Sequence, residues 1–163
     1  MLTPAQMAIL KTWLLANAQT LNDQEAADAL NTIASPVFNV YRSSVLMSEI
    51  MLNGFNWTRV DNLSVGKARI WDWMFAASDI KAIDPSKANV RTGINSVWVG
   101  TQADLDVRDA VYVHCYRSAT LAEKLLATGA GTAPVNDGDG SGPATMGFEG
   151  SITPQNVVDS YNS

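Results

Sequence analysis

The sequence predicts a mainly α-helical protein, a bundle of about six helices with a glycine-rich linker and an extended C-terminal tail. Three observations support this class. Helix-start signals recur along residues 1–128, apolar residues there repeat at helical spacing, and glycine and proline are concentrated in residues 129–143. A chain of 163 residues, 47% of them hydrophobic, fits one domain with a tail. We therefore expect a helical domain over 1–128, a flexible linker over 129–143 and a docking tail over 144–163.

The N-terminal helices are predicted from capping boxes. The run Thr3–Gln6 has the side chains of a box and a proline at the first helical position. Asn22–Glu25 is a second box, and it predicts a helix that ends near Ile33. A third helix is expected from Ser43, with Gly54 as its stop. The residues expected to face inward in the first two helices are Met7, Leu10, Trp13, Leu14, Ala26, Leu30 and Ile33.

Three further helices complete the predicted bundle. One runs from about Val65 to Ala77, the next follows the cap at Asp84, and the longest spans Gln102 to Ala127 after a capping box at Thr101. For the helix from Val65, we expect the apolar face to consist of Ile70, Trp73, Met74 and Ala77. Trp57 and Trp98 are also expected to be core residues.

The C-terminal segment regains apolar residues after the linker, and Thr153 and Pro154 mark another helix start. The anchors of this tail are Phe148, Ile152, Val157 and Tyr161. A tail with anchors docks either on its own domain or on a neighbouring subunit. We expect residues 147–163 to become ordered on a neighbouring copy, because a flexible linker of this length reaches an adjacent subunit.

Patterns for catalysis and metal binding are weak. His114 and Cys115 are adjacent and would point apart on a helix, so they do not form a base–nucleophile pair. The run Asp137–Gly142 resembles the start of a calcium loop, but Phe148 occupies the position of the bidentate glutamate. The run Ser64–Lys67 lacks the other residues of a phosphate-binding loop. We therefore predict no catalytic residue, no cofactor site, no metal site and no enzyme activity.

Tryptophan and basic residues indicate a partner surface. The net charge of −5 disfavours a broad nucleic-acid surface, although a local basic patch remains compatible with it. Trp71 and Trp73 are two residues apart, so one helix cannot turn both into the same core. Because tryptophan and arginine are enriched at interface hot spots, the candidate interface residues here are Arg59, Lys67, Arg69 and Trp71. The tail adds Phe148, Ile152, Val157 and Tyr161 to this set.

Several sequence runs resemble one family of viral proteins. These are SPVF at Ser35, GFNWTRVDNLSVGKARIWDWM at Gly54, RTGINSVWVGT at Arg91 and ATMGFEGSITPQNV at Ala144. In this order they resemble a small protein from the structural gene blocks of tailed bacteriophages and prophages. The resemblance implies a virion or assembly protein, and it covers most of the chain from Ser35 onward.

Among phage proteins of this size, the helical ones include the head–tail adaptor, so this role is the first expectation. This role implies a homo-oligomeric ring beneath the portal, with portal and tail proteins of the virion as partners. A contact with packaged DNA in the channel is possible for such a ring, and no membrane partner is expected. We expect the protein in the virion, assembled in the host cytoplasm. The alternatives are another virion protein (a tail terminator, a capsid decoration protein or a minor tail protein) and a non-structural phage protein that binds a host partner.

Overall fold

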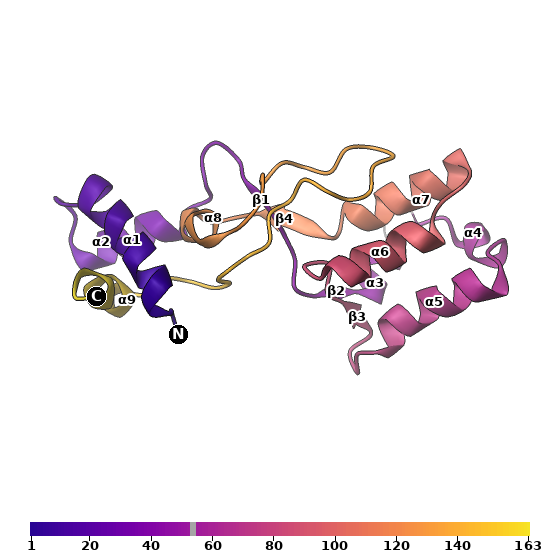
Figure 1. The fold of residues 1–163 in the computed structure, drawn as a ribbon, viewed down its shortest axis with the longest axis horizontal. Coiled ribbons are helices and arrows are strands. Elements are labelled where there is room, and N and C mark those ends of the chain that lie inside the picture. The colour runs from indigo at the N-terminus through magenta and orange to yellow at the C-terminus, as the bar shows by residue number, and fades with distance from the viewer. Residues whose placement is uncertain (53–54) are drawn as a thin grey trace. The chain divides into compact units, whose positions relative to one another are not determined.

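The computed structural model describes residues 1–52 and 55–163, and this part of the chain is mainly α-helical (Figure 1). Nine helices hold about half of the described residues, with only short strands between them. The helical class therefore agrees with the expectation, whereas the helices are shorter and more numerous than in a six-helix bundle. The expected helix stop at Gly54 lies outside the described residues.

The chain forms two compact units, each built from separate stretches of sequence. Unit 1 consists of Met1–Val40, Ser118–Gly131 and Ala144–Ser163. Unit 2 consists of Tyr41–Arg117 and Thr132–Pro143. This grouping differs from the expected helical domain, linker and tail, because both C-terminal stretches pack into units formed by earlier residues.

Unit 1 is a group of short helices to which both ends of the chain contribute. Its helices are α1 (Pro4–Asn17), α2 (Asp23–Asn31), α8 (Leu121–Leu126) and α9 (Pro154–Tyr161). The indigo helices α1 and α2 lie beside the yellow α9 in Figure 1, and α9 contacts both of them. The predicted capping boxes at α1 and α2 are present, and the predicted helix start at Thr153 also has a box, each with its reciprocal side-chain bonds. The largest fully buried side chains here are Leu10, Leu14 and Leu30.

The predicted docking tail is part of this core, which corrects the expectation that it waits for a neighbouring copy. Ile152 and Val157 are buried in unit 1, and Phe148 and Tyr161 pack against the same cluster. The Asn31 side chain fixes the entry to α9, since it donates to the carbonyl of Ile152 (2.8 Å) and accepts from its N–H (2.7 Å). The apolar anchors of the tail therefore have an intrachain partner.

Unit 2 contains the remaining helices around an aromatic core. They are α3 (Met47–Leu52), α4 (Trp57–Asp61), α5 (Val65–Ala76), α6 (Ala88–Val97) and α7 (Gln102–Tyr112). Helices α5 and α6 pack against each other, and α4 contacts α7. The strands β2 (Val45–Leu46) and β3 (Ala82–Ile83) pair antiparallel, with Val45 opposite Ile83.

Two other strands, β1 (Asn39–Tyr41) and β4 (Tyr116–Ser118), form a second two-stranded sheet. Strand β4 lies where the longest helix was predicted, so that prediction is wrong. After Tyr112 the chain continues with aromatic and β-branched residues, which favour extended backbone. A new capping box then starts α8: Thr120 N–H donates to Glu123 Oε2 (2.9 Å), and Glu123 N–H donates to Thr120 Oγ1 (3.3 Å).

The glycine-rich segment 132–143 is anchored on unit 2 and is not a free linker. Three side chains donate to its backbone carbonyls: Arg108 to Asp137 (2.5 Å), Asn95 to Asp139 (2.8 Å) and the Tyr41 hydroxyl to Gly140 (2.8 Å). Glycine is required at 140, where φ is +77° and a Cβ would overlap the ring of Tyr112.

Candidate functional site

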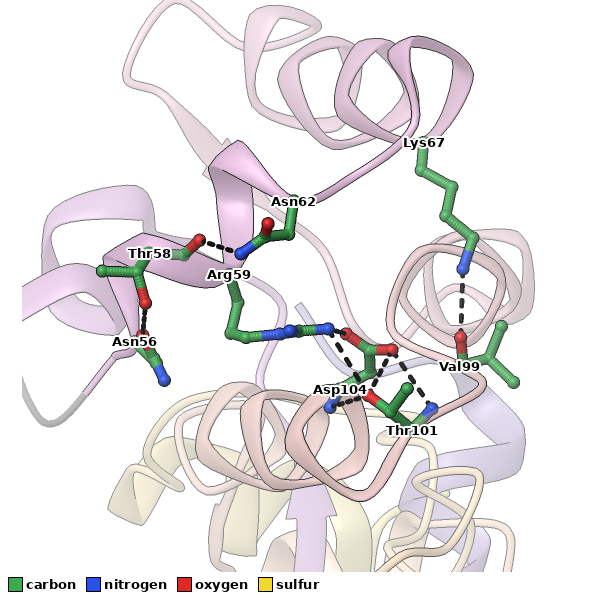
Figure 2. A network of polar contacts seen from close by, with 8 residues as sticks. All are labelled: Asn56, Thr58, Arg59, Asn62, Lys67, Val99, Thr101 and Asp104. Atoms are coloured by element: carbon green, nitrogen blue, oxygen red, sulfur yellow. Dashed lines mark hydrogen bonds and ion pairs between the residues drawn. The ribbon is translucent and has the colours of Figure 1, made fainter.

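A polar network ties α4 to the start of α7 in unit 2 (Figure 2). Arg59 on α4 donates through Nη2 to Asp104 Oδ1 (2.5 Å), and the two side chains form an ion pair. Asp104 also completes the capping box of α7, since its Oδ2 accepts from the Thr101 N–H (3.2 Å) and hydroxyl (2.8 Å). Asp104 is 7% exposed, so this pair is largely removed from solvent.

The charge state of Asp104 follows from these contacts. Burial alone would raise the pKa of Asp104, but the hydrogen bonds from Arg59 and Thr101 outweigh burial and hold the pKa below its usual value. The carboxylate is therefore charged at neutral pH, and its lone pairs are used to hold α4 and α7 together. Arg59, which was predicted as an interface residue, therefore has a structural role in unit 2, where it joins α4 to α7.

The other predicted basic residues lie on α5 and do not share one role. Lys67 donates through Nζ to the carbonyl of Val99 (3.1 Å), as Figure 2 shows. Arg69 is exposed, and its guanidinium lies over the Trp73 ring at 5.8 Å from the centroid. The structure thus leaves Arg69 at the surface and engages Arg59 and Lys67 with their own chain.

Trp71 is a core residue, which corrects its assignment as an interface residue. It is 1% exposed, and it stacks on Phe55 and meets Phe75 and Trp98 edge to face. Trp73 instead is 63% exposed, so the predicted apolar face is wrong at Ile70, Trp73 and Ala77, whereas Met74 packs against the core. The spacing of Trp71 and Phe75, four residues apart, was the signal for the true buried face.

An exposed apolar cleft lies beside α3 and α4, and sequence reasoning did not find it. Its volume is about 440 Å³. Trp57, expected in the core, is 58% exposed and lines this cleft. The lining residues are Met47, Ser48, Met51, Leu52, Trp57, Ile80 and Lys81. The methionines are half-buried and Trp57 is exposed, and such side chains are typical of surfaces that bind other proteins.

The lone cysteine is a buried residue of the unit 2 core. Burial raises the pKa of the Cys115 thiol to about 12, and its Sγ donates to the carbonyl of Val111 (3.3 Å). The thiol is therefore protonated at neutral pH.

Searches for two other kinds of site add two findings on residues 1–52 and 55–163. No group of three or more His, Cys, Asp or Glu side chains among them is placed to hold a metal ion. No helix in this range is long and apolar enough to cross a membrane.

Comparison with known proteins gives no assignment. No family model, no curated protein and no solved structure matches the chain. The candidate site is therefore identified from the structure alone, and it consists of the apolar cleft of unit 2 and the exposed side of α5.

Proposed function

We propose that the protein is a structural component of a tailed-phage virion, a head–tail adaptor that forms a ring beneath the portal. The observation that carries the proposal is the resemblance of four ordered sequence runs to a small protein of phage structural gene blocks. The longest run covers α4 and α5 of unit 2, and the last run leads into α9 of unit 1.

The surfaces of unit 2 support a role in binding other proteins. The resembling runs supply Trp57 of the cleft as well as Arg69, Ile70 and Trp73 on the exposed side of α5. The Arg59–Asp104 ion pair and the Trp71–Trp98 ring contact hold α4 and α5 from the inner side, so the exposed residues lie on helices with fixed positions in unit 2. A virion component needs such prearranged apolar surfaces for its neighbours, because ordering side chains on binding costs affinity.

The position of the chain in a purified particle tests the proposal. We expect a cryo-EM map of the virion that encodes the chain to place it as a ring between portal and tail, and mass spectrometry of the particle to detect it. A location elsewhere in the particle would instead support a tail terminator, decoration or minor tail protein. Absence from the particle, with the chain present in infected cells, would contradict every virion role and favour a host-directed protein.

A variant of the cleft adds a functional test. Trp57→Glu places a charge in the exposed cleft and removes one ring contact with Phe55. Because Trp57 is largely exposed, we expect near-normal folding and reduced incorporation into particles. Val135→Glu is the matched control, because Val135 is an exposed apolar residue of unit 2 outside the cleft. Equal incorporation of both variants would exclude the cleft as a virion contact.

A further inference from the structure

The apolar cleft of unit 2 has a lysine at its edge. Among the described residues that line the cleft, Lys81 carries the charge, and most of the others are apolar. The Lys81 side chain is exposed, and its ammonium makes no hydrogen bond or ion pair with residues 1–52 and 55–163. This cation is therefore free to meet a ligand that enters the cleft.

The backbone at Lys81 indicates that the lysine side chain has a purpose there. Its φ is +54°, in the left-handed region that glycine adopts without strain and lysine adopts at a cost. Two hydrogen bonds hold this conformation: the Lys81 N–H donates to the Ser78 carbonyl (3.0 Å), and the Lys81 carbonyl accepts from the Met47 N–H (2.9 Å). Residues held in this way are concentrated at ligand-binding and active sites.

The neighbouring carboxylates do not neutralise this charge. Glu49 on α3 pairs with Arg42 (2.9 Å) and accepts from the Leu46 N–H (2.8 Å). Asp79 is exposed two residues before Lys81, but it does not line the cleft and the two side chains form no ion pair. The cleft thus combines an apolar surface with one positive charge, and its complement is an apolar group beside a carboxylate.

We propose that the cleft binds a short segment of a partner protein in which apolar side chains flank an aspartate or a glutamate, and that Lys81 selects this carboxylate. The size fits, because an apolar cavity of about 150 Å³ holds a benzene ring. The volume of about 440 Å³ therefore has room for more than one large apolar side chain.

The open walls of the cleft favour a protein segment over a small molecule. Leu52, Trp57 and Ile80 remain 79%, 58% and 64% exposed. Sites for small molecules bury most of the ligand surface. A small ligand here would keep its outer side in water, whereas a protein segment covers the walls with its own neighbouring residues. The inference deepens the proposed function and rests on it only for the partner being a virion protein; the binding itself is a property of the chain in solution.

Selection of random displayed peptides on the immobilised full chain tests the chemistry of the ligand. We expect the enriched peptides to share an aspartate or glutamate beside apolar residues. The affinity of a synthetic peptide of this kind, measured by isothermal titration calorimetry, should fall as salt is added, because salt screens the ion pair.

Reversing the charge tests the role of Lys81. Lys81→Glu should weaken binding of the acidic peptide at least ~10-fold, and a peptide with lysine in place of the acidic residue should bind this variant better than wild type. Lys87→Glu is the matched control, since it changes the net charge equally at an exposed lysine of unit 2 outside the cleft. It should bind the acidic peptide as wild type does.

Lys81→Gly separates binding from folding. Glycine accepts the left-handed backbone, so the variant should melt no more than about 2 °C below wild type. Its affinity for the acidic peptide should nevertheless fall at least ~5-fold, because the ammonium is lost. A variant that melts well below wild type and binds the peptide as wild type does would show that Lys81 serves the fold, and would overturn the proposal.

The remaining outcomes separate this inference from the proposed function. A selection without enriched peptides, or with peptides that lack an acidic residue, would overturn the inference and leave the virion role to the particle map. Decanoate that displaces the selected peptides and binds more tightly than they do would also overturn it, in favour of a small amphiphile. Selective binding of acidic peptides by a chain that is absent from the virion would support the inference and contradict the role.

Discussion

Individual aromatic residues determine how unit 2 is filled. Trp98 is fully buried, with its ring 5.3 Å from that of Trp71 and 5.8 Å from that of Phe55, in edge-to-face arrangements. Such pairs add to the stabilisation from buried area. Trp57 also meets Phe55 edge to face, yet its side chain remains largely in solvent. Both tryptophans were expected in the core, but only Trp98 is buried there, so the two should contribute differently to stability.

Truncating these two tryptophans should give different results. We expect Trp98→Ala to lower the free energy of unfolding by about 3–5 kcal/mol, because it leaves a cavity in the aromatic cluster. Trp57→Ala should change it by less than about 1 kcal/mol, since the side chain is already exposed. Urea denaturation followed by circular dichroism measures both values. Equal losses would show that Trp57 belongs to the core.

The Arg59–Asp104 pair should make stability depend on pH. Because the folded-state pKa of Asp104 lies below its unfolded value, the pair stabilises the fold above the unfolded pKa of about 3.9. That contribution is lost as the pH falls through the folded-state pKa. We expect Asp104→Asn to lower the free energy of unfolding by about 2–3 kcal/mol at pH 7.

The pH series and a control complete this test. The difference between wild type and Asp104→Asn should shrink as melts are repeated from pH 7 to about pH 3. Asp106→Asn, an exposed aspartate on the same helix, should change stability by at most about 0.5 kcal/mol throughout. A difference that is constant over the series would show that ionisation of Asp104 is not the cause.

At the scale of helices and strands, the residues where helices begin could be predicted from local sequence, whereas the helices that pack together could not. The capping boxes at Thr3, Asn22 and Thr101 and the helix start at Thr153 were predicted because these signals use residues within one turn. The box at Thr120 was missed because the surrounding residues were assigned to one long helix.

The buried side of α5 and the partner of α9 depend on residues far away in the sequence. Trp71 meets Trp98, and α9 packs against helices at the other end of the chain. Helical spacing alone does not identify the buried face of α5, because apolar residues occur on both sides of the helix. Sequence reasoning therefore named Trp71 as a surface residue, whereas the structure buries Trp71 and exposes Trp73 on the same helix.

Two glycines in unit 2 should respond oppositely to alanine. At Gly140 the backbone is left-handed and the Tyr112 ring is fixed by its hydroxyl, which donates to Asn95 Oδ1 (2.9 Å). Gly140→Ala should therefore cost at least about 2 kcal/mol. Gly66 lies in α5 with nothing within 4 Å of an added Cβ, so Gly66→Ala should stabilise by about 0.5 kcal/mol. Thermal melts of both variants check the two signs, and two equal shifts would contradict the anchored loop.

At the scale of the whole molecule, the chain passes between the units after Val40, Arg117, Gly131 and Pro143. Unit 1 needs three stretches of sequence, and unit 2 needs two. The predicted boundary after residue 128 would thus remove essential parts of both units.

A chain that ends at Thr128 should not fold. It lacks Ile152 and Val157 of the unit 1 core and the loop that Arg108, Asn95 and Tyr41 hold on unit 2. We expect loss of the cooperative thermal transition and binding of a hydrophobic dye. A chain that ends at Tyr161 is the control and should melt close to full length. Wild-type melting of the shorter chain would support the division at residue 128.

The interleaved chain also has an evolutionary consequence. Genes exchange segments by recombination, and a single crossover replaces one continuous stretch of coding sequence. Because unit 1 is drawn from the start, the middle and the end of the chain, every single crossover inside the chain mixes unit 1 from two parents. A recombinant that joins two diverged relatives inside this gene would combine mismatched parts of the unit 1 core, and a crossover between residues 41 and 143 would also mix unit 2. Viable exchanges should therefore fall at the ends of the gene, and the protein should be inherited as one block.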